Sequence, residues 1–90
     1  MATSRTFEIL WEKLENERTA FDSLFKNGIA TAEESFKRLT IIKRNLEDVK
    51  MKAERGLRDP WEHEEITTAT DALFTTVSEI LSSMDKKSTR

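Results

Sequence analysis

The sequence has 90 residues, 37% of them hydrophobic and 36% charged, with a formal net charge of −2 and no cysteine. A chain of this length has room for one hydrophobic core, so we expect a single domain. The lack of cysteine excludes a disulfide framework and thiolate zinc sites. No stretch approaches the roughly 18 apolar residues of a membrane span, and no apolar signal segment opens the chain. We therefore expect the protein to be located in the cytoplasm, either of its own cell or of a host cell.

Glycine and proline are scarce, with two glycines and one proline in the chain. A small β-sandwich or barrel needs many turn residues, so we expect an all-α fold. The first helix is predicted over residues 4–27, where apolar side chains gather on one helical face. Gly28 ends this helix, because glycine reaches the left-handed C-terminal conformation at little steric cost. The apolar stripe comprises Phe7, Leu10, Trp11, Leu14, Phe21, Leu24 and Phe25.

The second helix is predicted over residues 31–55. Thr31 and Glu34 have the spacing of a capping box, in which each side chain satisfies a free backbone N–H of the first turn. Gly56 and the Asp59-Pro60 pair stop the helix. Its apolar stripe comprises Phe36, Leu39, Ile42, Leu46, Val49 and Ala53.

The third helix is predicted over residues 60–85. Asp59 is its expected N-cap, Pro60 suits the first helical position, and Glu62 completes a second capping box. Residues 86–90 are predicted to form a disordered basic tail. The apolar stripe comprises Ile66, Ala69, Leu73, Val77, Ile80 and Met84, flanked by Phe74 and Leu81.

The connections between these helices are too short to cross a bundle, which predicts an up-down-up three-helix bundle over residues 1–85. The alternative is a helical hairpin that completes its core only by dimerising. The bundle predicts four core layers: Leu10 with Val49 and Ile66, Leu14 with Leu46 and Ala69, Phe21 with Leu39 and Val77, and Leu24 with Phe36 and Ile80.

Charge is sorted along the chain. Residues 59–85 carry seven acidic side chains and no Lys or Arg, whereas residues 28–58 carry eight basic side chains and five acidic ones. We therefore expect the second and third helices to attract each other, and each to offer a partner a face of different sign.

Catalytic and metal-binding patterns are missing from the sequence. His63 is the one histidine, so a two-histidine metal site cannot form, and its acidic neighbours indicate an ordinary surface position. Adjacent carboxylates such as Glu64 and Glu65 point about 100° apart on a helix and make no shared acid–base site. No phosphate-binding loop or nucleophile elbow is present. We expect no enzyme activity, no metal and no cofactor.

Nucleic-acid binding is an alternative that the sequence disfavours. The basic residues ring the second helix, as charges do when they pair with neighbouring helices and water, and the isoelectric point is about 5.5. The acidic third helix alongside would repel phosphate. The side chains concerned are Lys37, Arg38, Lys43, Arg44, Lys50, Lys52, Arg55 and Arg58, with Lys86, Lys87 and Arg90 in the tail.

Large apolar residues outside the stripes favour a docking function. Ile9, Ile41, Met51 and Trp61 each point more than about 100° away from their helix's stripe. In the bundle, Ile9, Met51 and Trp61 share one end with Trp11 nearby, and Trp and Met are enriched where proteins dock. The alternative is that Trp61 closes the bundle and Met51 fills a gap in it.

The outward side of the third helix is rich in Thr and Ser rather than Lys and Glu. Hydroxyl groups are easier to bury than charges, so this side suits contact with another protein or with a second copy of the chain. The alternative is an unconstrained surface. The residues are Thr67, Thr68, Thr75, Thr76, Ser78, Ser82 and Ser83.

The sequence therefore predicts a non-catalytic interaction or regulatory module, of the adaptor or inhibitor kind, that binds another protein. We expect acidic side chains on the third helix to steer a basic partner, which affects the association rate more than the affinity. Self-assembly into a homodimer or a larger array is a further alternative. The expected apolar anchors are Trp11, Trp61, Ile9, Met51 and Ile41, and the expected acidic contacts are Glu64, Glu65, Asp71 and Glu79.

Overall fold

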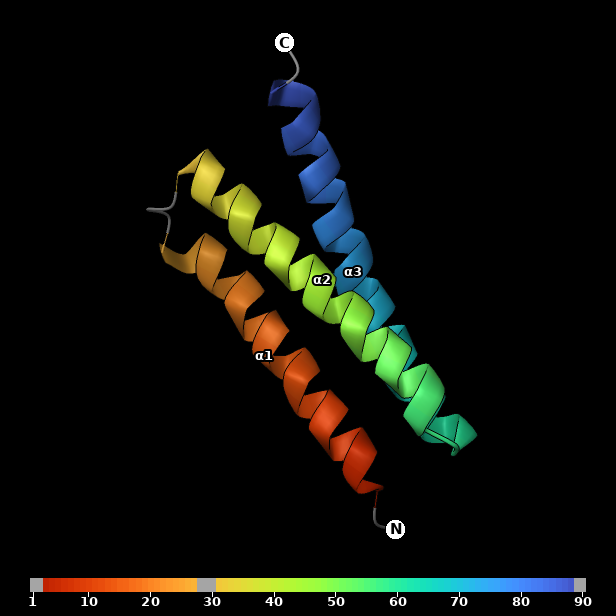
Figure 1. Cartoon of the computed structure of the whole chain (residues 1–90). Coiled ribbons are helices and arrows are strands. Elements are labelled where there is room, and N and C mark those ends of the chain that lie inside the picture. The colour runs from red at the N-terminus through yellow and green to blue at the C-terminus, as the bar shows by residue number, and fades with distance from the viewer. Residues whose placement is uncertain (1–2, 28–30, 89–90) are drawn as a thin grey trace.

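A computed structural model describes residues 3–27 and 31–88, apart from the side chains of Phe25, Asn27 and residues 85–88. Within these ranges the chain forms α1 (Arg5–Asn27), α2 (Ala32–Gly56) and α3 (Pro60–Ser88), and no strand. The helices run up, down and up (Figure 1), and α2 packs against both of the others. The predicted all-α three-helix bundle is confirmed.

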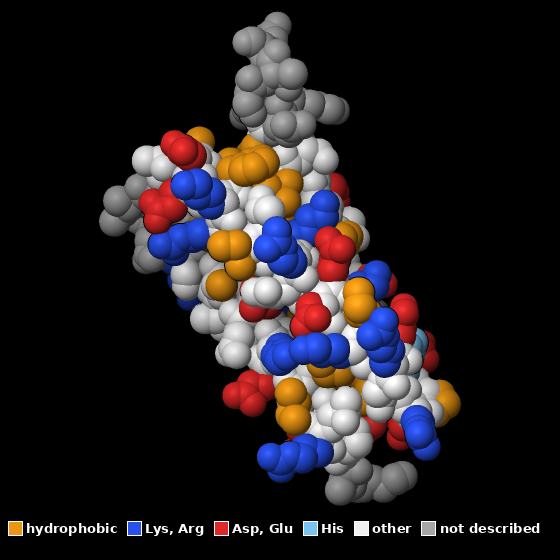
Figure 2. Space-filling view, in the orientation of Figure 1, with side chains coloured by type: hydrophobic (Ala, Val, Ile, Leu, Met, Phe, Trp, Pro, Cys, Tyr) orange, Lys and Arg blue, Asp and Glu red, His pale blue; other side chains and the backbone are white. Residues whose placement is uncertain are grey.

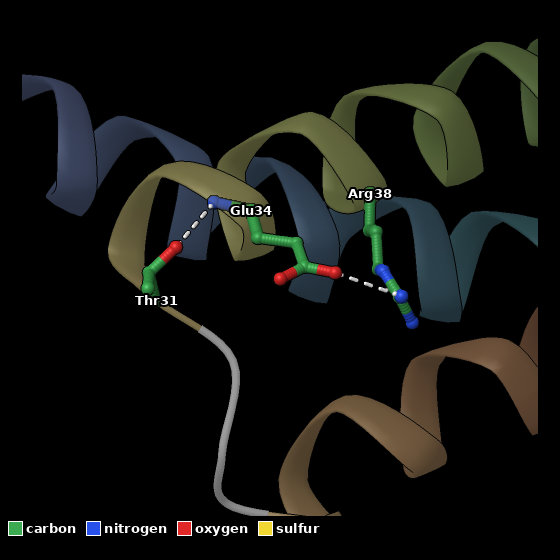
Figure 3. A network of polar contacts seen from close by, with 3 residues as sticks. All are labelled: Thr31, Glu34 and Arg38. Carbon is green, nitrogen blue, oxygen red and sulfur yellow. Dashed lines mark hydrogen bonds and ion pairs between the residues drawn. The ribbon is translucent and has the colours of Figure 1, made fainter.

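The helix ends follow the capping residues. Thr31 accepts the Glu34 N–H through Oγ1 at 3.1 Å, and Asp59 accepts the Trp61 N–H through Oδ1 at 3.0 Å. The Glu34 carboxylate does not complete a capping box, because it pairs with Arg38 Nη2 at 2.9 Å (Figure 3). At the other end of the chain, α3 continues to Ser88, so residues 86–88 of the predicted tail are helical. Gly28 and residues 89–90 lie outside the described residues.

The core consists of two apolar clusters along the bundle. The first lies near the starts of α1 and α3 and contains Leu10, Val49 and Ile66, as predicted. The second lies toward the other end, where Leu14 and Leu46 are fully buried. The members of the first cluster are Phe7, Leu10, Val49, Ala53, Leu57 and Ile66, and those of the second are Leu14, Leu39, Ile42, Leu46 and Val77, with Ala69, Phe21, Leu24 and Ile80 packed against them.

Two core assignments differ from the sequence prediction. Phe36 was expected to face Leu24 and Ile80, but its side chain is 40% exposed. Figure 1 shows α3 diverging from α1 at that end, so three helices no longer enclose one seam there. Thr70, absent from the predicted stripe, is fully buried, whereas Leu73 and Ile80 are half-buried. Thr70 lies four positions after Ile66 and seven before Val77, so it shares the buried side of α3 although its side chain is polar.

Contacts between α2 and α3 have the expected signs of charge. Lys50 Nζ lies 2.6 Å from Asp71 Oδ1, and this hydrogen bond raises the pKa of Lys50 above its usual value. The ammonium groups of Lys43 and Lys50 lie 5.6 and 5.5 Å from the centre of the Phe74 ring, within the range of cation–π attraction. The basic second helix therefore uses part of its charge to hold the third.

Candidate protein-docking surface

The starts of α1 and α3 are joined by a buried carboxylate. Ser4 donates its backbone N–H to Glu62 Oε2 at 2.7 Å and its hydroxyl to Oε1 at 2.8 Å. Glu62 is only 4% exposed. The Ser4 hydroxyl also accepts the Phe7 N–H at 3.2 Å, so Ser4 is the N-cap of α1. Glu62 was expected to complete the capping box of its own helix, but its carboxylate holds the first turn of α1 instead.

This link brings three aromatic rings together. The Phe7 ring, in the first cluster of the core, has its centre 5.6 Å from that of Trp11 and 5.9 Å from that of Trp61. The ring plane of Phe7 makes an angle of 22° with that of Trp11 and of 34° with that of Trp61, and both pairs lie at the distances of favourable aromatic contacts. Trp61 is 57% exposed. We call these three residues the aromatic surface, which runs from the core at Phe7 to solvent at Trp61.

The other predicted anchors are exposed but lie elsewhere. Ile9, Ile41 and Met51 have 46%, 55% and 50% of their surface in solvent. Residues two positions apart on a helix point about 160° apart, so Met51 lies opposite the buried Val49 and Ile9 lies opposite Phe7. Ile9, Met51 and Trp61 therefore share one end of the bundle without sharing a face. Among the predicted anchors that the structure describes, ring contacts join Trp11 and Trp61, with Phe7 between them.

The predicted acidic contacts divide into two groups. Glu64 and Glu65 are exposed and lie three and four positions after Trp61, so they are its neighbours on the surface of α3. Asp71 is already paired with Lys50, which leaves less of its charge for a partner. Glu79 is exposed and lies 18 residues beyond Trp61, about 27 Å along the helix.

On α1, the exposed Glu8 lies three positions before Trp11, which makes it a neighbour of that ring. We call Glu8, Glu64 and Glu65 the acidic rim. Sequence reasoning missed Glu8, and it assigned Phe7 to the core without its contact with Trp61. The spacing of Ser4 and Phe7, which is that of an N-cap and its N–H donor, is the signal that fixes how α1 begins.

The cations of α2 are partly engaged within the chain. Arg38 pairs with Glu34 at 2.9 Å, Lys52 with Asp48 at 3.0 Å and Lys50 with Asp71 at 2.6 Å. Lys43 lies over the Phe74 ring. Four of the eight basic residues that the nucleic-acid alternative placed on α2 thus have partners among the described residues.

The chain matches no protein-family model, no curated protein and no solved structure. In the part of the chain that the structure describes, no helix combines the length and the apolar content that crossing a bilayer requires. The described side chains also include no group of three or more His, Cys, Asp or Glu residues placed to hold a metal ion.

Proposed function

We propose that this protein is a non-catalytic interaction module that binds a basic segment of another protein through the aromatic surface. The observation that carries the proposal is Trp61, which is 57% exposed although its ring packs on Phe7. The part of the Trp61 ring that lies in water adds no stability to the bundle. A tryptophan that a partner covers can supply much of a binding energy.

The surroundings of Trp61 reduce the entropy that binding would cost. The Asp59 cap fixes its backbone, and the Phe7 ring fixes its side chain from one side. A group held in its bound orientation before association loses less freedom on binding than a mobile one. The aromatic surface is therefore better suited to docking than Met51, whose flexible side chain lies opposite the core.

Charge indicates the chemistry of the partner. The acidic rim places carboxylates beside both tryptophans, and Arg or Lys side chains bind carboxylates and also stack on the faces of tryptophan rings. A segment with one basic and one apolar side would satisfy both features. Such binding suits a regulatory or adaptor role in the cytoplasm of the cell of origin or of a host, carried by a surface rather than by a pocket.

Trp61→Ala should weaken capture of the partner at least tenfold, since truncated tryptophan anchors commonly cost about 2 kcal/mol of binding. The measurement is affinity capture from the native host, with wild-type and variant protein as bait and quantitative mass spectrometry as readout. Met51→Ala is the matched control, because Met51 is also half exposed near this end but points elsewhere.

We expect one partner protein to be captured by the wild-type and Met51→Ala baits and lost from the Trp61→Ala bait. The melting temperature of Trp61→Ala should change little. Equal capture by all three baits would contradict the proposal. So would a large loss of melting temperature with capture intact, because Trp61 would then serve the core.

A further inference from the structure

The outer face of α3 over residues 72–84 is nearly free of charge. Residues 72–84 include one charged side chain, Glu79, in a chain of which 36% is charged. A shallow depression runs along this part of the helix, and small hydroxyl side chains form most of its lining. We call it the α3 face, and its lining residues are Phe74, Thr75, Ser78, Glu79, Ser82 and Ser83.

Apolar groups beside the α3 face are incompletely covered by the bundle. Phe74, Leu81 and Met84 are half-buried, and Phe36 is 40% exposed. Apolar side chains gather in Figure 2 where the start of α2 lies beside the C-terminal half of α3. Ser78 Oγ is buried and has no hydrogen-bond partner among the described residues. This end of the molecule thus has apolar surface that the bundle covers incompletely, whereas the Ser78 oxygen is buried and lies out of a partner's reach.

The charges at the α3 face are complementary to one another. Lys43 places its ammonium group 5.6 Å from the centre of the Phe74 ring, at the α2 side of the depression, and Glu79 lines the depression itself. Neither forms an ion pair among the described residues. In a two-fold dimer, each residue of one copy meets the symmetry-related surface of the other. A two-fold axis that passes between Lys43 and Glu79 would bring Glu79 of each copy toward Lys43 of the other.

We propose that the α3 face is the contact between two copies of this chain. A face that meets itself must be almost uncharged or carry both signs; the α3 face has one charged residue, Glu79, and Lys43 of α2 adds the opposite sign at its edge. The basic segment proposed for the aromatic surface would find a single carboxylate here. The contact lies toward the opposite end of the bundle from Trp61, so a dimer leaves both copies of the aromatic surface free.

The test is the mass of the full chain in solution, by sedimentation equilibrium over a dilution series. Wild type should approach twice 10.5 kDa at high concentration and dissociate on dilution. Glu79→Lys and Lys43→Glu should each weaken the dimer about tenfold, because each places like charges opposite one another. The double variant should recover the wild-type dissociation constant, since the pair is restored with its signs exchanged.

Controls with the same charge changes lie elsewhere on the surface. Glu12→Lys on α1 and Arg44→Glu on α2 should leave the dimer unchanged, since both residues are exposed and outside the α3 face. Circular dichroism of every variant shows that it is folded. A wild-type chain that remains monomeric throughout would overturn the proposal. The proposal would also be overturned if the single variants dimerised as tightly as wild type, or if the double variant dimerised more weakly than either single variant.

Failure of this test would not affect the proposed docking function. The aromatic surface shares no residue with the α3 face, and Trp61→Ala should leave the mass in solution unchanged. Conversely, a dimer with a recovered double variant would stand even if capture by Trp61→Ala equalled that of wild type. Each proposal thus has its own variant and its own readout.

Discussion

Glu62→Ala is expected to lower the free energy of unfolding by about 2 to 3 kcal/mol, because two charge-assisted hydrogen bonds are lost together. Glu62 is only 4% exposed, and its carboxylate accepts from both the backbone N–H and the hydroxyl of Ser4. Without it, the first turn of α1 loses its hydrogen bonds to α3 and keeps only the apolar contacts of Phe7. Urea unfolding followed by circular dichroism measures the change.

Glu64→Ala is the matched control, because Glu64 lies in the same region of α3 but is exposed. It should change the free energy of unfolding by no more than about 0.5 kcal/mol. Ser4→Ala should be less stable than wild type, and its effect should not add to that of Glu62→Ala, since both changes remove the same link. Equal effects of Glu62→Ala and Glu64→Ala would mean that the carboxylate does not join the two helices.

Thr70→Val is expected to raise the free energy of unfolding by about 1 to 2 kcal/mol. Thr70 is fully buried, and its Oγ1 has no hydrogen-bond partner among the described residues. Valine has nearly the same shape and a similar helix propensity, and it replaces the unpaired hydroxyl with a methyl group that the core accepts. Thermal and urea unfolding should both show the increase.

Thr67→Val separates this effect from a general gain in hydrophobicity. The Thr67 hydroxyl donates to the His63 carbonyl oxygen at 2.7 Å, so its removal takes away a bond that is already made. Thr67→Val should leave stability unchanged or slightly reduced. A decrease in stability of Thr70→Val would show that the Thr70 hydroxyl is satisfied in solution. Equal gains in both variants would attribute the increase to hydrophobicity in general and not to the unpaired hydroxyl.

Local signals in the sequence were sufficient for most of the fold. Thr31 and Asp59 mark helix starts because their side chains accept backbone N–H groups two or three residues later, and both bonds form. Apolar periodicity likewise identified Leu14 and Leu46 as fully buried. Phe36 was assigned to the core wrongly because periodicity gives the direction of a side chain, whereas burial also depends on where neighbouring helices diverge. Thr70 was left out because it is polar, although it has the spacing of the buried Ile66 and Val77.

The candidate site was predictable in its residues but not in its geometry. The helical wheel indicated that Trp61 and Met51 point outward, and both are at least half exposed. The contact of Phe7 with Trp61 depends on how far α1 and α3 are shifted along each other, which no local pattern encodes. The bonds between Ser4 and Glu62 join residues 58 positions apart, and the capping-box pattern favoured a local partner for Glu62.

The most direct test of the account is quenching of Trp61 fluorescence in a Trp11→Phe variant, which leaves Trp61 as the one tryptophan. Caesium and iodide ions quench exposed indole rings and carry opposite charges. We expect long-wavelength emission and stronger quenching by caesium than by iodide, because Glu64 and Glu65 lie beside the ring. Short-wavelength emission that neither ion quenches would place Trp61 inside the bundle and contradict the docking surface.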